Sequence, residues 1–456
     1  MLESQNPPES DGIDQTELDE FDQTERITAR LRDLVRSYPK GLALIKEFLQ
    51  NADDAGAKDL RLIYDRRHHP DAFPNHPGMK VALGPALLFF NDQRFNKEDR
   101  KGIRHIGEGS KMVDAARTGR FGQGFNTCYS VSDHPSILSG NWIVWFDPHH
   151  RALGSGKNAR AWHLSRAAEM WPEWIETFAP AAPAYRYARS YSEETLHLPQ
   201  DTAEPVYYWH PDDGAFPGTV FRLPVRSAEH APHSEILPEA FTDEDFDAIL
   251  DEIRRVGPAL LIFLRSVISL EIREIGADGK DTLRYWIHTN NAEHVEEKRK
   301  KLRDVVNGDP EQLLDHWLES TDPLPVVQFD QVFVVCDGED IKREETWAVT
   351  TGLFRGTDNI LLKTALEVCR HGDKAIPWAG TAVQRNPLAT PAGQVTHKLA
   401  CFLPLPLAEE TPSATKPWTV WLHGWFDLNS SRREITRQAD VGGTTQARYE
   451  WNRALM

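Results

Sequence analysis

The sequence predicts an α+β fold, in which helices pack on a sheet as a layered sandwich. Amphipathic helical spacing and short apolar strand segments both occur in the first 230 residues, without regular strand–helix–strand alternation. The chain has 456 residues, more than one ordinary core accommodates, so we expect two folded domains. Its 40% hydrophobic and 27% charged residues are typical of a globular protein.

The net charge of the chain argues against one class of binding partner, nucleic acid. Lys and Arg number 52 and Asp and Glu number 69, which gives a net charge of −17. A phosphate backbone repels such a chain, so nucleic acid is disfavoured as a general partner, although a local basic groove stays open. The N-terminus has no signal-peptide pattern, and the best apolar run, residues 259–267, is short and contains Arg265. We therefore expect a cytoplasmic protein without a membrane partner.

The first domain is predicted over residues 21–230, after a flexible acidic tail at residues 1–20 that has little to bury. Apolar spacing predicts one helix from Thr24 to just before Pro39, and a second that ends near Asp54. Strand patterns occur at residues 59–64, 86–90, 141–146 and 219–223.

A linker is predicted at residues 228–238, and a second α+β domain over residues 231–456. A helix is expected at residues 243–256, and the charge run at residues 296–303 is interpreted as an exposed helix face. Strands are expected at residues 325–336, 345–352, 398–404 and 418–426, and a last helix at residues 445–456. Because that helix stops without a cap, we expect the chain to be the N-terminal part of a longer protein.

The second helix carries the first candidate site. Glu47, Asn51 and Asp54 are spaced i, i+4 and i+7, so their side chains share one helix face. A carboxylate and an amide oxygen on such a face can hold a hard cation and orient a water molecule. The same spacing also occurs on ordinary solvated helix surfaces.

Two further segments could contact a nucleotide. Asp92 follows the apolar strand at residues 86–90, where its carboxylate could accept a hydrogen bond from an exocyclic amine such as that of adenine. The glycines of residues 118–126 permit a tight loop whose amide groups converge on an anion. Taken singly, each segment is better explained as an ordinary turn.

Together, in this order, the three segments resemble the GHKL ATPase superfamily, which includes the ninety-kilodalton heat-shock chaperones, gyrase-type topoisomerases, histidine kinases and MutL-type repair proteins. The similarity is greatest to the sacsin branch of that superfamily. It is carried by residues 45–55 (IKEFLQNADDA), 119–125 (GRFGQGF), 132–140 (SDHPSILSG) and 146–149 (FDPH). In the second domain, residues 402–406 (FLPLP) and 424–433 (GWFDLNSSRR) look like the segment that follows the ATPase domain in sacsin.

The resemblance implies a two-layer α/β sandwich of the GHKL, or Bergerat, type followed by a middle-type domain. It also implies ATP and Mg²⁺ as cofactors. Glu47 would be the general base, Asn51 would hold Mg²⁺, and Asp92 would bind the adenine amine beside Thr219. Arg432, with Arg433 as the alternative, would be an arginine finger from the second domain. The remaining implied nucleotide contacts are Asp54, Lys111, Gly119, Arg120, Phe121, Gly122, Gln123, Gly124 and Phe125.

The implied function is a Mg²⁺-dependent ATPase of a sacsin-like or chaperone-like protein. A lid at residues 93–120 would close on the nucleotide and reorient the domains, acting on a protein partner or on attached domains, as in a chaperone or a defence-type assembly. Chaperones of this superfamily dimerise, so a homodimer is also an expectation. One departure favours an alternative: most superfamily members read D-x-G-x-G where residues 92–96 read DQRFN. The alternative is an interaction scaffold that binds nucleotide without hydrolysing it.

Overall fold

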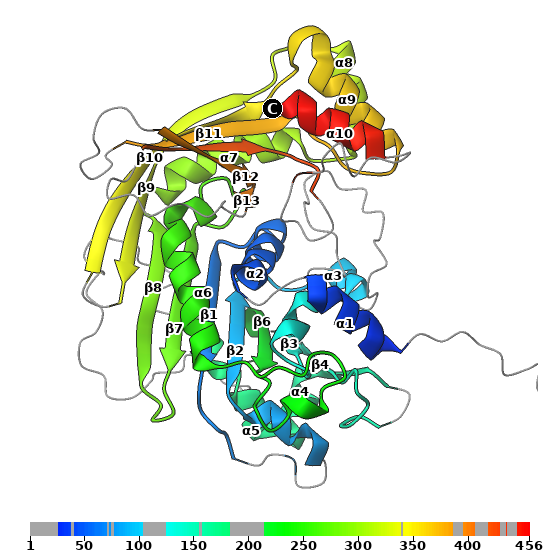
Figure 1. The fold of residues 1–456 in the computed structure, drawn as a ribbon, viewed down its shortest axis with the longest axis vertical. Coiled ribbons are helices and arrows are strands. Elements are labelled where there is room, and N and C mark those ends of the chain that lie inside the picture. The colour runs from blue at the N-terminus through cyan, green and yellow to red at the C-terminus, as the bar shows by residue number, and fades with distance from the viewer. Residues whose placement is uncertain are drawn as a thin grey trace, which may run out of the picture.

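The structure is a computed structural model of the 456-residue chain. It describes residues 26–37, 41–70, 73, 77–103, 125–154, 157–182, 214–338, 341–385, 395–405, 418–428, 435 and 445–456. The described strands form one 14-stranded sheet in the order β13-β12-β14-β11-β10-β9-β8-β7-β1-β2-β6-β3-β4-β5 (Figure 1). The fold is therefore α+β, as the sequence predicts.

The strands have the bounds β1 Asp59–Asp65, β2 Ala86–Asn91, β3 Ser136–Gly140, β4 Trp142–Phe146, β5 Ala159–His163, β6 Phe216–Pro224, β7 Ser269–Ile275, β8 Asp281–Thr289, β9 Val326–Asp337, β10 Ile341–Leu353, β11 Trp378–Gln384, β12 Val395–Cys401, β13 Leu403–Pro404 and β14 Trp418–Gly424. The α-helices are α1 Ile27–Ser37, α2 Leu42–Asp54, α3 Lys97–Gly102, α4 Leu164–Met170, α5 Pro172–Glu176, α6 Asp243–Val256, α7 Ala292–Val305, α8 Pro310–Glu319, α9 Ile360–Arg370 and α10 Thr445–Leu455. Short 3-10 turns include η1 Pro77–Leu83, η2 Phe125–Ser130 and η6 Ala231–His233.

Strand β2 is buried on both faces of the sheet. Leu87 and Phe89 belong to the core that includes residues of α1, α2 and α6. Leu88 and Phe90 point to the opposite face, into a second core with residues of η1, α4 and α5. The sequence predicted a two-layer sandwich for the first domain, and this part of the prediction is wrong. Here the sheet is covered on both faces, because β2 directs large apolar side chains alternately to one face and to the other.

The sheet is continuous across the predicted domain boundary at residue 230. Strand β1 pairs antiparallel with β2 and parallel with β7, from Asp59 opposite Ser269 to Asp65 opposite Ile275. On the β13 side of β7 the sheet continues as far as β12 and β13, and α8, α9 and α10 lie together near one end (Figure 1).

Most predicted elements lie within a few residues of their expected bounds, and α6 has the predicted bounds of 243–256. Two interpretations are wrong in part. The predicted linker packs on α1, since Thr28 Oγ1 donates to Glu235 Oε2 at 2.9 Å and Ile236 is buried. The charge run of α7 is not wholly exposed, because Arg299 is buried. The predicted tail at residues 1–20 lies outside the described residues.

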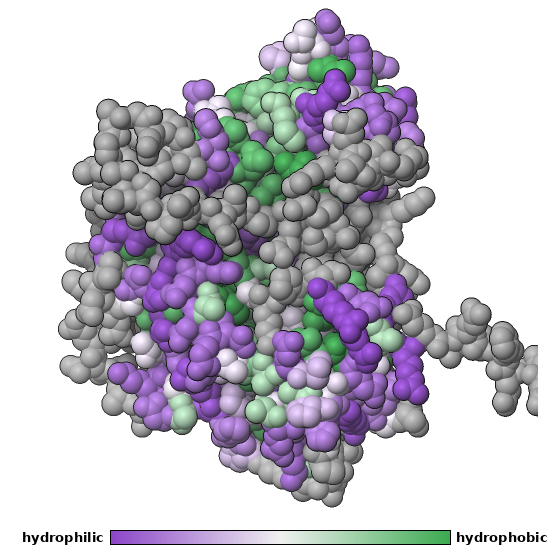
Figure 2. All heavy atoms as spheres, in the orientation of Figure 1, coloured by the Kyte–Doolittle hydropathy of each residue, from purple (hydrophilic) through white to green (hydrophobic). Residues whose placement is uncertain are grey.

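The surface in the orientation of Figure 1 is mostly hydrophilic around α1 and α6, whereas hydrophobic side chains gather in its upper part, in the region of β11 (Figure 2). None of the helices in the described part of the chain is both long and apolar enough to cross a membrane.

Candidate functional site

Helix α2 carries three of the predicted site residues, Glu47, Asn51 and Asp54. It begins after Gly41, whose φ of 126° favours glycine, and the Glu252 carboxylate of α6 accepts the Leu42 N–H at 2.8 Å. Glu47 is buried and Asn51 half-buried, one turn apart along the helix. A carboxylate and an amide oxygen are thus held next to each other on a rigid element.

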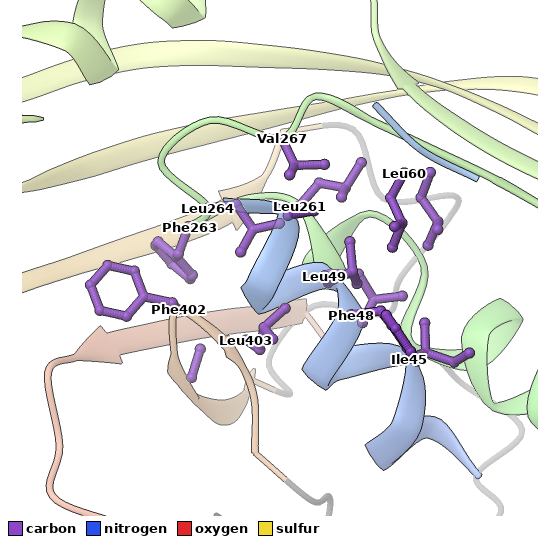
Figure 3. Close-up of a cluster of buried hydrophobic side chains, with 14 of the residues drawn as sticks. Ile45, Phe48, Leu49, Leu60, Leu261, Phe263, Leu264, Val267, Phe402 and Leu403 are labelled. Carbon is purple, nitrogen blue, oxygen red and sulfur yellow. The ribbon is translucent and has the colours of Figure 1, made fainter. Parts of the chain in front are cut away.

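The apolar side of α2 fixes its position on the sheet. The Phe48 ring stacks on Phe89 of β2 at 3.8 Å between centroids, and it meets Phe221 of β6 edge-on at 5.0 Å. Leu44, Ile45, Leu49 and Ala52 are also buried in this core (Figure 3 shows part of it). Because interiors are close-packed, this contact leaves little freedom for the helix to shift along the sheet.

Asp92 lies at the turn between α2 and β1. Its Oδ1 atom accepts the backbone N–H of Lys58 at 2.8 Å and, more weakly, that of Asp59 at 3.4 Å. These bonds place the carboxylate of the residue after β2 beside the chain that leaves the C-terminal end of α2.

Thr219 lies opposite Asn91, where β6 pairs with β2. Its hydroxyl donates to the Gln93 carbonyl at 2.7 Å and lies 2.7 Å from the Ser139 hydroxyl, which in turn accepts the Phe95 N–H at 2.8 Å. A side chain at Gly218 could not fit, because its Cβ would be 2.3 Å from the Asn91 carbonyl oxygen. Thr219 is therefore held next to the segment that follows Asp92.

Phe125 ends the predicted glycine loop and begins η2. Its ring packs on Phe146 at 5.0 Å and on Phe221 at 6.0 Å. The end of the glycine loop therefore lies on the same sheet face as α2, next to that helix. The other predicted contacts lie outside the described residues, namely Lys111, Gly119, Arg120, Phe121, Gly122, Gln123, Gly124, Arg432 and Arg433.

Asp54 is engaged by a residue from the second half of the chain. The Arg265 guanidinium donates to its carboxylate, and the Asp54 side chain is only 1% exposed. Asp53, next to it, accepts the backbone N–H groups of Ser266 at 2.6 Å and Val267 at 3.1 Å. The structure thus gives Asp54 an ion pair within the protein, and a contact to nucleotide stays a prediction.

The structure places three further charged residues, Asp53, Arg265 and Asp59, beside the predicted site, and the sequence analysis did not predict them. Asp53 and Arg265 could have been suspected, because Arg265 is the one charge in the apolar run at residues 259–267, where burial demands a partner. Asp59 is the third: burial, and next the Asp92 carboxylate, raise its pKa to about 6. No sequence pattern marks it.

Asn51 is the residue that the sequence predicts as the Mg²⁺ ligand. Among the described residues, no three His, Cys, Asp or Glu side chains converge on a common metal position. Mg²⁺ is commonly held by one or two protein oxygens together with phosphate oxygens and water. The half-buried amide of Asn51 on α2 could supply such an oxygen.

Comparison with known proteins agrees with the resemblance to sacsin. A family model described as "Sacsin domain" matches residues 24–285. Sacsin from Homo sapiens is 28% identical over 441 residues, which cover 96% of this chain and 9% of sacsin. The chain thus spans less than a tenth of the length of that relative.

A solved structure, described as the N-terminal domain of a DNA repair protein, aligns with 76% of this chain and 84% of its own length. The sequence identity is 10% and the TM-score is 0.29. A likeness at that level bears on neither the fold nor the function of this chain.

Proposed function

This chain belongs to the sacsin domain family, and on that premise we propose that it is an ATPase module of the GHKL type. ATP would bind with Mg²⁺ between α2 and the start of η2, at the ends of β2 and β6. Because the chain covers only 9% of human sacsin, the activity, cytoplasmic location and partners of any larger assembly belong to the same proposal.

The observation that carries the proposal is that the rings of Phe48 and Phe125 both pack against the ring of Phe221. The ring centroids of the two residues lie 5.0 and 6.0 Å from that of Phe221. The helix that bears Glu47 and Asn51 and the end of the glycine loop are therefore neighbours on one sheet face. Had the chain placed them on opposite faces, no single triphosphate could contact both.

The residues divide the work of phosphoryl transfer. Glu47 would take a proton from, or orient, the attacking water, a role that suits a buried carboxylate on a rigid helix. Asn51 would hold Mg²⁺, which when bound neutralises charge that develops on the phosphates. Asp92 would accept a hydrogen bond from the adenine amine, with Thr219 beside it, and the amides of residues 119–125 would surround the phosphates.

Two variants test this assignment. Glu47→Gln keeps the shape of the side chain but removes the base, so we expect phosphate release to fall at least about 100-fold while ATP affinity changes little. Asp92→Asn places an amide at the proposed adenine contact, so we expect ATP affinity to fall about tenfold or more. Calorimetric titration with Mg²⁺ and ATP, and phosphate release, measure the two effects. Glu244→Gln, on an exposed turn of α6, is the control.

Equal phosphate release from Glu47→Gln and the parent chain would remove Glu47 as the base. Equal ATP affinity of Asp92→Asn and the parent would remove Asp92 as the adenine contact.

One observation favours a second candidate, an interaction scaffold that binds nucleotide without hydrolysing it. In the segment that lacks the usual glycines, the Phe95 ring packs on Phe221 at 5.9 Å, and Asn96 caps the N-terminus of α3. Bulky, fixed side chains thus occupy this segment. Absence of binding heat and of a thermal shift with ATP, ADP and Mg²⁺ would favour a scaffold that needs no nucleotide, and binding without turnover would favour a nucleotide-gated one.

The proposed output is a change in the second half of the chain that acts on a protein partner, on attached domains or on a second copy. Closure of residues 93–120 over the nucleotide would drive it. Arg432 would then reach the γ-phosphate. Arg432→Ala should lower phosphate release with little loss of ATP affinity, and equal activity of the variant and the parent would contradict this role.

A further inference from the structure

The C-terminal end of α2 is fixed by an ion cluster that spans the two halves of the chain. Arg265 lies between two adjacent carboxylates: its Nε and backbone N–H donate to Asp53 at 3.2 and 3.1 Å, and its guanidinium donates to Asp54. The side chains of Arg265, Asp53 and Asp54 are 4%, 2% and 1% exposed. Removing the guanidinium would leave buried carboxylates without a partner, which destabilises a fold strongly. The folded state therefore holds these three side chains in one arrangement.

The loop that carries Arg265 is held in turn by α7. The Arg299 guanidinium donates to the carbonyls of Val267 at 2.9 Å and Leu261 at 2.7 Å. Arg303 donates to the carbonyl of Arg265 itself. Arg265 therefore cannot follow a movement of α2 unless the loop at residues 261–267 and α7 move as well.

The same guanidinium rests on the turn between β12 and β13. It lies over the Phe402 ring, 5.2 Å from its centroid, and Phe402 adopts a φ of 57°, which is unusual for a bulky residue. Its backbone N–H donates to His423 Nδ1 at 3.2 Å. Two residues later, the carbonyl of Pro404 accepts the Lys46 ammonium of α2. Figure 3 shows Phe402 and Leu403 grouped with Leu261, Phe263 and Leu264 around one end of α2.

We propose that Arg265 is a positioning residue for the ATPase reaction, an inference that rests on the proposed function. Asp54 lies three residues after Asn51, about 4.5 Å along the helix axis. By holding Asp53 and Asp54, Arg265 sets where Asn51 and Glu47 stand relative to the β12–β13 turn. In this role Arg265 acts through Asp53 and Asp54, which it contacts directly. A change at the triphosphate is thereby passed to Phe402 through one buried side chain.

Kinetics of Arg265→Lys test the proposal. Lysine keeps the charge but lacks the fork that holds two carboxylates, so α2 shifts slightly. We expect kcat to fall about 10- to 100-fold, with KM for Mg²⁺-ATP changed less than about threefold, because sub-ångström misplacement acts on the transition state. Arg67→Lys is the matched control. It weakens a bidentate pair with buried Asp65 at the other end of β1, and should leave kcat unchanged.

A parental kcat for Arg265→Lys, or an equal fall in the Arg67→Lys control, would overturn the positioning role. Should Arg265→Lys fail to fold, Phe402→Leu removes only the ring beneath the guanidinium, and the same split between kcat and KM is expected.

A second measurement does not depend on ATP turnover. Hydrogen exchange of Arg265→Lys should quicken both at residues 52–57 and at the amides of Phe402 and Leu403, while β1 stays protected. If the parent chain neither binds nor hydrolyses ATP, the proposed function fails. Quicker exchange at both segments would then still establish the link between α2 and the β12–β13 turn. Quicker exchange at residues 52–57 alone would show that no such link exists.

Discussion

At the scale of single residues, the segment after Asp92 is fixed by a chain of hydroxyl groups. The Phe95 N–H donates to Ser139, Ser139 lies within hydrogen-bond distance of Thr219, and Thr219 donates to the Gln93 carbonyl. Both hydroxyls are fully buried. Because a buried polar group without a hydrogen-bond partner destabilises the fold, these hydrogen bonds hold residues 93–95 against β3 and β6.

We predict that Thr219→Val lowers the free energy of unfolding by about 1–3 kcal/mol, because it leaves the Gln93 carbonyl and the Ser139 hydroxyl short of a partner. Urea denaturation measures the loss. In a double-mutant cycle, Ser139→Ala combined with Thr219→Val should cost less than the two separate losses together. Strict additivity would show that the two hydroxyls do not act as a pair.

Asp59 makes folding sensitive to pH. Its pKa in the folded chain, about 6, lies above the ordinary 3.8, because burial and then Asp92 disfavour its charge. Between these two pH values the folded state binds more protons at Asp59 than the unfolded state does. This contribution to stability is therefore full below about pH 4 and is lost as pH rises through about 6.

Asp59→Asn should abolish that contribution. The difference in unfolding free energy between the parent and the variant, measured in urea from pH 4 to pH 8, should shift in favour of the variant as pH rises and level off above about pH 6. A difference that is constant across this range would contradict the raised pKa.

At the scale of elements, α7 supports the loop that reaches α2. Its hydrophilic sequence is typical of a surface helix, yet Arg299 is buried. Burial, opposed by the Asp53 charge, lowers the pKa of Arg299 to about 10, so the guanidinium stays charged at neutral pH. The carbonyls that it contacts are those of the loop at residues 261–267.

We predict that Arg299→Met lowers the free energy of unfolding by about 2–4 kcal/mol, since it leaves two buried carbonyl groups without this donor. Lys300→Met, at the neighbouring exposed position of the same helix, is the control and should change it by less than about 0.5 kcal/mol. Equal effects of the two substitutions in urea denaturation would argue against the structural role of Arg299.

At the scale of the whole molecule, the parallel pairing of β1 with β7 joins the halves into one sheet. The predicted boundary at residue 230 separates Asp53 and Asp54 from Arg265 and leaves one edge of β1 without a partner. An unpaired edge strand invites association with other chains. The family model also extends past this point, to residue 285.

A fragment of residues 21–230 should therefore aggregate or melt well below the whole chain, in which β1 pairs with β7 and Arg265 binds Asp53 and Asp54. Size-exclusion chromatography and thermal unfolding of the fragment and the whole chain compare them directly. A monomeric 21–230 fragment that melts at the temperature of the whole chain would show that the first domain folds without β7.

Local patterns in the sequence predicted much of the fold and part of the site. Alternating and continuous apolar runs located β1, β2 and β9, and helical spacing located α2 and α6, because these signals depend on neighbouring residues. The spacing of Glu47 and Asn51 on one helix also follows from local geometry. The second core beneath β2 was missed, since its aromatic side chains come from segments far apart in the chain.

The sequence by itself determined the α+β class, the sacsin resemblance, and which helix and strand ends carry Glu47, Asn51, Asp92 and Thr219. Only the tertiary structure decided that Asp53 and Asp54 form ion pairs with Arg265, more than 200 residues away, and that one sheet runs through both halves of the chain. The reason is physical. Helix and strand periodicities depend on residues that are close together in the sequence. The partner of a buried charge depends on packing, which brings together residues that no local spacing relates.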